Sequence, residues 1–205
     1  MIHNLIRNVI NDMWPTLTIT SVTLITVRFA YLKNHRSSFT FHQEFWYLVS
    51  ILYMLLLYQL VTKVDYSLRG GFNIVPFTEI MRYDIKDQLF ISNVLGNIIL
   101  FIPFGYMISS YIKPKKMWTN MLIAIIVSAT IEVVQLNIGR SFDIDDILLN
   151  TIGCIIGFLI YIGFKAIGNH LPEFLKSDWF QNLLCCLIII LMVIYILRFM
   201  GIVII

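Results

Sequence analysis

The feature that most constrains this chain is a series of apolar stretches, each long enough to cross a lipid bilayer. They run over about residues 14–32, 45–62, 90–112, 118–138, 147–164 and 183–205. A membrane-spanning helix needs about 20 mostly apolar residues, so we expect six spans. Charged residues make up only 13% of the chain, against roughly 25% in a typical soluble domain. The sequence therefore predicts an all-α, polytopic helical membrane protein and excludes an ordinary soluble one.

Residues 2–13 have a different pattern, since their apolar and polar side chains alternate at helical spacing. This pattern is typical of a helix lying in the membrane interface, and it does not resemble a removable signal peptide. The 14–32 stretch is the most polar of the six, and Arg28 near its end could reach the headgroups. We therefore divide the chain into an interfacial helix with the first span (1–44), a central membrane region (45–168), and a surface segment with the last span (169–205).

The distribution of cations predicts the orientation, because short cytoplasmic loops of membrane proteins are enriched in Lys and Arg. Seven cations share one side in short loops, three of them in the KPKK sequence at 113–116. The other side holds six, four of which lie in the long 63–89 loop beside four acidic residues. We expect a multi-pass plasma-membrane protein with a cytoplasmic KPKK loop. Both termini and the 63–89 and 139–146 loops would then be external.

Polar side chains gather at the outward ends of three neighbouring predicted spans. The 90–112 span begins with amide side chains. Near the end of the 118–138 span, a hydroxyl, a carboxylate and an amide share one helix face. An arginine precedes the next span, which begins with acidic residues. An ionisable group inside an apolar helix costs roughly 2.5–3.5 kcal/mol, so Glu132 is expected to face a cavity or a partner. We name this candidate ligand-binding group the polar cluster; it comprises Asn93, Asn97, Ser128, Glu132, Gln135, Arg140, Asp143, Asp145, Asp146 and Asn150.

The same residues allow purely structural roles. Ser141 or Asp143 could cap the following helix, whose dipole favours the acids in its first turn, and Arg140 could simply pair with one of the carboxylates. The amides could be hydrogen-bond links between helices. Gly153 and Gly157 form a GxxxG pattern, from which we expect close helix packing.

Catalysis and metal binding also remain open. Glu132 could act as a general base, and Asp143, Asp145 and Asp146 could bind a hard divalent cation. No phosphate-cradling glycine loop and no known nucleophile motif is present, and no cofactor can be assigned. The three cysteines lie in or beside apolar runs, where we expect them to be unreactive. Glu132 is the only carboxylate within a predicted span, which disfavours an ion-transport path.

Four sequence segments, in their order and spacing, resemble the VanZ-like family. They read FNIVPFTEI from residue 72, NVLGNIILFIPFGYMI from 93, SATIEVVQ from 128 and RSFDIDDILLNTIGCIIGF from 140. The resemblance covers about residues 50–165. Carried over position by position, the family's motifs fall on a loop motif of Asn73, Pro76 and Phe77, and on Gly96, Asn97, Phe101, Pro103, Gly105, Glu132, Gln135, Arg140, Asp143, Asp145, Asp146, Asn150 and Gly153.

The family takes its name from a teicoplanin-resistance protein of glycopeptide-resistant bacteria. The resemblance implies resistance to teicoplanin and related lipoglycopeptides in a Gram-positive bacterium. The expected partners are membrane lipids and a cell-wall precursor or lipoglycopeptide held by the polar cluster at the outer face, whereas the scattered cations give no nucleic-acid surface. The alternative is an intramembrane enzyme that modifies an envelope substrate through Glu132 and the three aspartates. A transporter is a weaker alternative.

Overall fold

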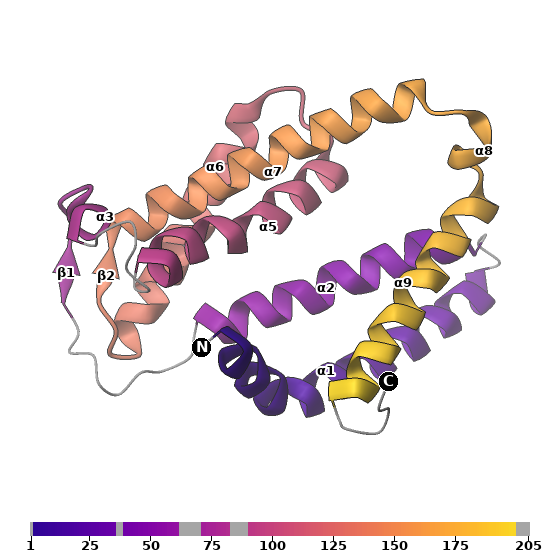
Figure 1. The fold of residues 1–205 in the computed structure, drawn as a ribbon, viewed down its shortest axis with the longest axis horizontal. Coiled ribbons are helices and arrows are strands. Elements are labelled where there is room, and N and C mark those ends of the chain that lie inside the picture. The colour runs from indigo at the N-terminus through magenta and orange to yellow at the C-terminus, as the bar shows by residue number, and fades with distance from the viewer. Residues whose placement is uncertain (1, 36–38, 62–70, 83–89, 200–205) are drawn as a thin grey trace. The chain divides into compact units, whose positions relative to one another are not determined.

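The computed structural model describes residues 2–35, 39–61, 71–82 and 90–199 (Figure 1). Within these residues, six helices are long and apolar enough to cross a membrane, which confirms the predicted fold class. Most of the predicted 63–89 loop, several cations of the orientation argument and the predicted end of the last span lie outside the described residues. The six candidate spans are Met13–Asn34, Phe41–Val61, Asn93–Ile112, Met117–Asn137, Ile144–His170 and Asp178–Tyr195.

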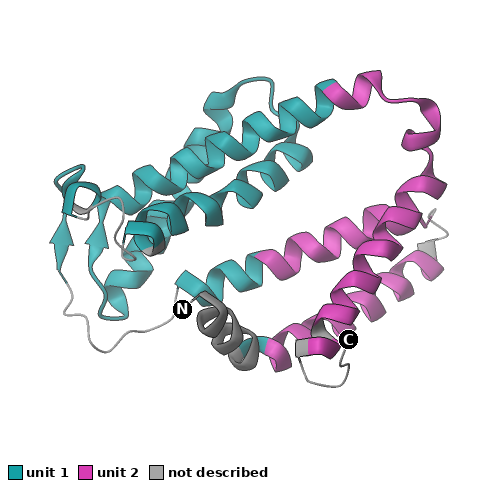
Figure 2. Cartoon of the chain, in the orientation of Figure 1, with its two compact units in different colours: residues 1–13, 54–166 teal, residues 14–53, 167–205 magenta. Residues whose placement is uncertain are grey.

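The chain divides into two compact units (Figure 2). Unit 1 comprises residues 1–13 and 54–166, and unit 2 comprises residues 14–53 and 167–205. Helix α1 (Ile2–His35) contributes to both units as one continuous helix with Pro15 inside it. The sequence analysis separated an interfacial helix from the first span at this point. The side-chain pattern does change near Met13, but the backbone does not break there.

Unit 2 contains most of α1, the first part of α2 (Phe41–Val61), α8 (Glu173–Lys176) and α9 (Asp178–Phe199). Arg28 of α1 donates two hydrogen bonds to the Glu44 carboxylate of α2, both at 2.8 Å. The Arg28 side chain, which the sequence suggested could extend to the headgroups, is thus held by a neighbouring helix. The amide oxygen of Asn182 in α9 accepts the backbone N–H of His42 at 3.0 Å. These two contacts tie the three long helices of this unit together.

Unit 1 is built around α5 (Gly96–Ile112), α6 (Met117–Asn137) and α7 (Ile144–His170). A Cβ added to Gly105 of α5 would lie 2.2 Å from the Cys154 carbonyl oxygen of α7. In α7, a Cβ added to Gly153 would lie 2.3 Å from the Ile98 carbonyl oxygen of α5. One added to Gly157 would lie 2.2 Å from the Ile102 carbonyl oxygen. Such distances are far below normal contact, so the two backbones touch. The close packing expected from the GxxxG pattern is present.

Two sharp connections position these helices. Lys113 ends α5 with a left-handed conformation (φ 52°), and its N–H donates to the Ser109 carbonyl at 2.9 Å. Pro114 follows and cannot continue the helix hydrogen bonding. After α6, Gly139 adopts a φ of +90°, a value that a residue with a side chain rarely reaches. The chain then returns at once into α7.

Short elements cover the start of α7. Strand β1 (Phe72–Asn73) pairs in parallel with β2 (Phe142–Asp143), and α3 (Thr78–Arg82) follows β1. A π-helical turn, η1 (Ile91–Leu95), leads directly into α5. The strands and the π-helical turn are only two to five residues long, too short to produce a periodic pattern from which they could be predicted.

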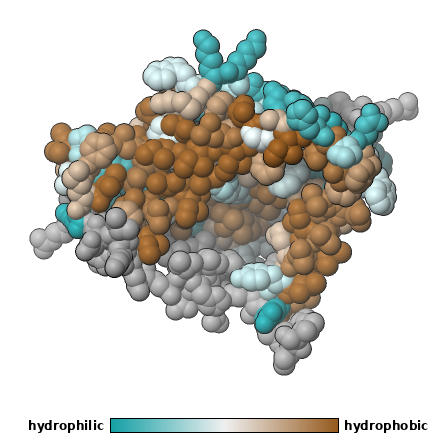
Figure 3. Space-filling model, turned by 45° about the horizontal axis from the view of Figure 1, so that its top comes forward, coloured by the Kyte–Doolittle hydropathy of each residue, from teal (hydrophilic) through white to brown (hydrophobic). Residues whose placement is uncertain are grey.

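The exterior is apolar, as the membrane assignment requires. Hydrophobic residues dominate the described surface of the face drawn in Figure 3. Several of the large ones along α9, including Leu187, Leu191 and Val193, are exposed. All three cysteines are unpaired; Cys154 and Cys185 are buried, whereas Cys186 is exposed.

Candidate functional site

The parallel strand pairing brings the loop motif to the polar cluster. Phe72 lies opposite Phe142 and Asn73 opposite Asp143. The Phe142 N–H donates to the Gly71 carbonyl at 2.9 Å, and the Asn73 side-chain amide donates to the Asp143 carboxylate at 3.0 Å. A residue singled out only by the family resemblance therefore contacts a residue of the cluster that lies 70 positions away in the sequence.

Glu132 is buried in α6 with 1% of its surface exposed. Its Oε2 atom accepts a hydrogen bond from the backbone N–H of Asp143 at 2.8 Å. This hydrogen bond pairs a buried acceptor that would otherwise cost free energy. The partner that we expected for Glu132 is thus the backbone N–H of Asp143, directly before α7.

Two aspartates at the start of α7 organise the surrounding backbone. The Asp143 carboxylate accepts the N–H of Asp145 at 2.8 Å, which is the geometry of a helix N-cap. The fully buried Asp145 carboxylate accepts the N–H of Phe77 at 2.5 Å and that of Ile80 at 3.4 Å. Phe77 has a positive φ of 68°, so this contact holds an uncommon backbone turn. The capping role that the sequence left open for Asp143 is therefore present, and Asp145 fixes the start of α3.

Two further contacts link the helices of unit 1 to each other. The Asn97 side-chain amide of α5 donates to the Asp146 carboxylate of α7. The Asn150 side-chain amide of α7 donates to the Ser128 hydroxyl of α6 at 2.8 Å. The other end of the Asn150 amide, Oδ1, is buried and has no hydrogen-bond partner among the described residues. An unpaired buried acceptor costs free energy unless water or a ligand satisfies it.

Gln135 and Arg140 meet at the end of α2. The Gln135 side-chain amide donates to the Val61 carbonyl at 3.0 Å, and an Arg140 guanidinium N–H donates to the same oxygen at 3.4 Å. The Arg140 backbone N–H also donates to the Gln135 carbonyl at 2.9 Å. The position of Val61 beside the cluster could not be predicted, because a backbone carbonyl has no side-chain pattern in the sequence.

The remaining predicted residues lie at the edge of this arrangement. Asn93 is exposed in the π-helical turn, whereas Asn97 is half-buried against Asp146. Pro76 is exposed, and Phe77 joins the site through its backbone while its ring is 53% exposed. The loop motif therefore contributes the side-chain amide of Asn73 and the backbone N–H of Phe77 as donors, together with the exposed ring of Phe77.

A metal site formed by Asp143, Asp145 and Asp146 gains no support from this geometry. Within the described part of the chain, no group of three or more His, Cys, Asp or Glu side chains is arranged to hold a metal ion. Asp143 and Asp145 accept hydrogen bonds from backbone amides, and Asp146 accepts one from Asn97. The metal site stays a prediction.

Comparison with known proteins places this arrangement in a family. A family model described as VanZ/LLP1 matches residues 45–168. The chain belongs to the VanZ/LLP1 family. It is also similar to Protein VanZ of Enterococcus faecium, with 25% identity over 154 residues that cover 73% of this chain and 87% of the relative. No solved structure is significantly similar to it.

The polar cluster and the loop motif lie entirely within the VanZ/LLP1 match. The matched range also contains the glycine-mediated contact of α5 with α7 and the pairing of β1 with β2. The family region thus coincides with a packed helix group and the hydrogen-bonded residues at one end of it.

A second buried polar group lies further along the same helices and was missed by the sequence analysis. The Asn120 side-chain amide donates to the Ser109 hydroxyl at 2.6 Å and to the Gly105 carbonyl at 3.2 Å, and the Cys154 thiol contacts the Asn120 carbonyl at 3.6 Å. Asn120, Ser109 and Cys154 are fully buried. The signal available in the sequence was Asn120 itself, because an asparagine in the first turn of an apolar span indicates a buried polar contact.

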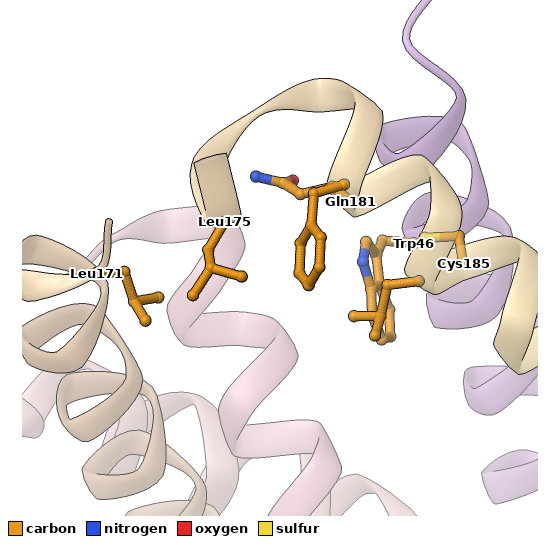
Figure 4. A pocket seen from close by; sticks show the side chains of 7 residues that line it. Trp46, Leu171, Leu175, Gln181 and Cys185 are labelled. Atoms are coloured by element: carbon orange, nitrogen blue, oxygen red, sulfur yellow. The ribbon is translucent and has the colours of Figure 1, made fainter. Parts of the chain in front are cut away.

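Unit 2 contains a separate apolar pocket of about 330 Å³ (Figure 4). Its lining includes Trp46 of α2, Leu171 and Leu175 near α8, and Gln181 and Cys185 of α9. Figure 4 shows the Leu171 and Leu175 side chains on one side of it and Trp46 on the other. The lining contains no acid or cation, and most of it follows the residues matched by the family model. We therefore place the candidate site at the polar cluster.

Proposed function

We propose that this VanZ/LLP1 protein contributes to resistance or tolerance toward teicoplanin and related lipoglycopeptides. In this proposal the polar cluster binds a lipid headgroup, a lipid-linked cell-wall precursor or the antibiotic itself at the outer face of the plasma membrane. The observation that carries the proposal is the concentration of carboxylates, amides and one guanidinium around the start of α7, within the residues matched by the family model. The similarity to Protein VanZ supports the choice of resistance as the process.

Binding fits the contacts of the cluster better than turnover does. Glu132 and Asp145 both accept backbone N–H groups and are nearly or fully buried, so they shape the site rather than face a reacting group. Arg140 and Asp146 are half-buried and lie nearer the surface. These two charged residues, with the exposed Asn93 and the half-buried Asn97, are ones that a ligand could reach without unfolding the loop.

The donors and acceptors of the cluster suit a phosphate-bearing polar ligand. A guanidinium such as that of Arg140 forms strong charge-assisted hydrogen bonds with phosphate oxygens. The Asp146 carboxylate, which is half-buried, would accept hydrogen bonds from a hydroxyl or amide of a headgroup or precursor. Phosphate groups and hydroxyl or amide groups occur together in lipid-linked envelope molecules. Glycopeptides meet such molecules at the outer leaflet.

The test is the inhibitory concentration of two glycopeptides in a susceptible Gram-positive host that expresses the chain. Teicoplanin carries an acyl chain that enters the outer leaflet and vancomycin carries none, so the expected protection is greater against teicoplanin. Arg140→Ala and Asp146→Asn should each reduce it. Arg198→Ala and Asp178→Asn make the same chemical changes at exposed positions of α9 and should leave it unchanged, provided that all variants reach the membrane equally.

The outcomes separate binding from the alternatives. A binding protein should protect in proportion to its copy number per cell. An intramembrane enzyme should leave altered lipid or precursor visible by mass spectrometry even at low copy number. Equal inhibitory concentrations with and without the parent chain, for both drugs, would refute the resistance proposal and leave the family assignment intact.

A further inference from the structure

The segment Phe72–Arg82, which contains β1 and α3, turns its apolar side chains outward. The exposed fractions are 73% for Phe72, 70% for Ile74, 62% for Val75, 53% for Phe77 and 82% for Met81. Five large apolar side chains are thus exposed within ten residues, and gathered exposed apolar surface marks contact with a membrane or a partner. We name these five residues the apolar loop patch.

The segment lies at the depth where a membrane span begins. Strand β1 pairs residue by residue with β2, which directly precedes α7 and the Ile144–His170 span (Figure 1). Asp145, in the first turn of that span, binds the backbone at Phe77 and Ile80. The segment is therefore fixed beside the first turn of this candidate span.

The backbone of the segment is prepared for an apolar surrounding. An unsatisfied N–H in hydrocarbon costs several kcal/mol, yet here the Phe77 and Ile80 N–H groups donate to the Asp145 carboxylate and the Met81 N–H donates to the Phe77 carbonyl at 3.0 Å. The Thr78 hydroxyl donates to the Val75 carbonyl at 2.8 Å. These backbone and hydroxyl groups are thus paired while large apolar side chains are exposed, which fits an interfacial element.

We propose that the apolar loop patch inserts into the bilayer leaflet that surrounds the start of α7. The lipid is favoured over other occupants because the segment is paired to the start of a candidate span, and the large side chains exposed along the spans of unit 1, such as Ile99 and Ile152, are apolar as well. This insertion would hold the polar cluster at the boundary between acyl chains and headgroups. The inference does not depend on the proposed function or on which leaflet this end faces.

Nitroxide labels can measure the surroundings of the patch directly. The exposed Cys186 is first replaced by Ser and the pocket-lining Cys185 by Ala, and the buried Cys154 is kept. Single cysteines are then introduced at Val75 and Met81, labelled, and reconstituted in phospholipid bilayers. Collision rates with oxygen, which concentrates in hydrocarbon, and with a water-soluble nickel chelate are measured by power saturation.

Two positions of unit 1 serve as references. Ile152, exposed in the middle part of α7, represents lipid, and Ser141, exposed in the connection before α7, represents water. The proposal predicts that the ratio of oxygen to nickel collisions at Val75 and Met81 is several-fold higher than at Ser141 and approaches that at Ile152. Both labels accessible to nickel as at Ser141 would overturn it. Labels shielded from both reagents would also overturn it, because a second copy or another protein would then cover the patch.

Discussion

The contact between α5 and α7 gives a prediction whose size follows from the structure. A methyl group at Gly157 would lie 2.2 Å from the Ile102 carbonyl oxygen and 2.7 Å from the Tyr106 nitrogen. Both are backbone atoms, so no side-chain rotation can relieve the overlap. Ordinary contact begins at 3.4 Å, and the helices would have to separate by more than 1 Å. Gly157→Ala is therefore expected to destabilise unit 1.

A second glycine of the same helix provides a matched control. Gly163 has no atom within 4 Å of the Cβ that an alanine would add. Overpacking a well-packed interior costs about 1–3 kcal/mol, whereas replacing a helical glycine by alanine in open space stabilises the helix by about 0.5–1 kcal/mol. Both substitutions gain this helix stabilisation, so the free energies of unfolding of Gly157→Ala and Gly163→Ala should differ by the overpacking cost alone, about 1–3 kcal/mol.

The assay is unfolding by increasing mole fractions of sodium dodecyl sulfate in mixed micelles, followed by circular dichroism. Gly157→Ala should unfold at a lower fraction than the parent chain, and Gly163→Ala at the same or a higher one. If both variants unfold together with the parent, α5 and α7 are not in backbone contact and the reasoning fails.

Two further predictions concern Glu132 and the orientation. Glu132→Gln keeps an oxygen for the Asp143 N–H, so it should fold normally and retain protection against teicoplanin. Glu132→Ala leaves that N–H unpaired and should lower the free energy of unfolding by about 1–3 kcal/mol in the same detergent titration. Loss of protection in a normally folded Gln variant would show that the carboxyl group does more than accept this hydrogen bond. Single cysteines at Lys115 and Ser141, in a background with Cys186→Ser, should respond oppositely to an impermeant thiol reagent in intact cells. Labelling at Ser141 is expected, and labelling at Lys115 alone would invert the proposed topology.

The sequence predicted the features that repeat over many residues. Each span is a long apolar run, and a bilayer permits few structures other than helices for such runs. The GxxxG at Gly153 and Gly157 predicted close packing because only a missing side chain permits it. The grouping of acids and amides at the ends of three spans was also visible, since helix periodicity and short connections bring such positions to one level.

The roles of the individual acids were not predictable in the same way. Asp145 binds backbone amides of Phe77 and Ile80, more than 60 positions earlier, and a backbone amide looks the same at every residue. The pairing of Asn73 with Asp143 involves strands of two residues, too short for a periodic pattern. Sequence reasoning could therefore place these acids near each other but could not tell a ligand-binding carboxylate from one that fixes a loop.

Native mass spectrometry tests the proposed binding site most directly. The parent chain, Asp146→Asn and the α9 control Asp178→Asn are released from membranes of the Gram-positive host, with teicoplanin added in one arm. A lipid, a cell-wall precursor or the antibiotic should remain bound to the parent and to Asp178→Asn and should be lost from Asp146→Asn. The same bound mass on all three chains, or none on the parent in either arm, would contradict a binding function of the polar cluster.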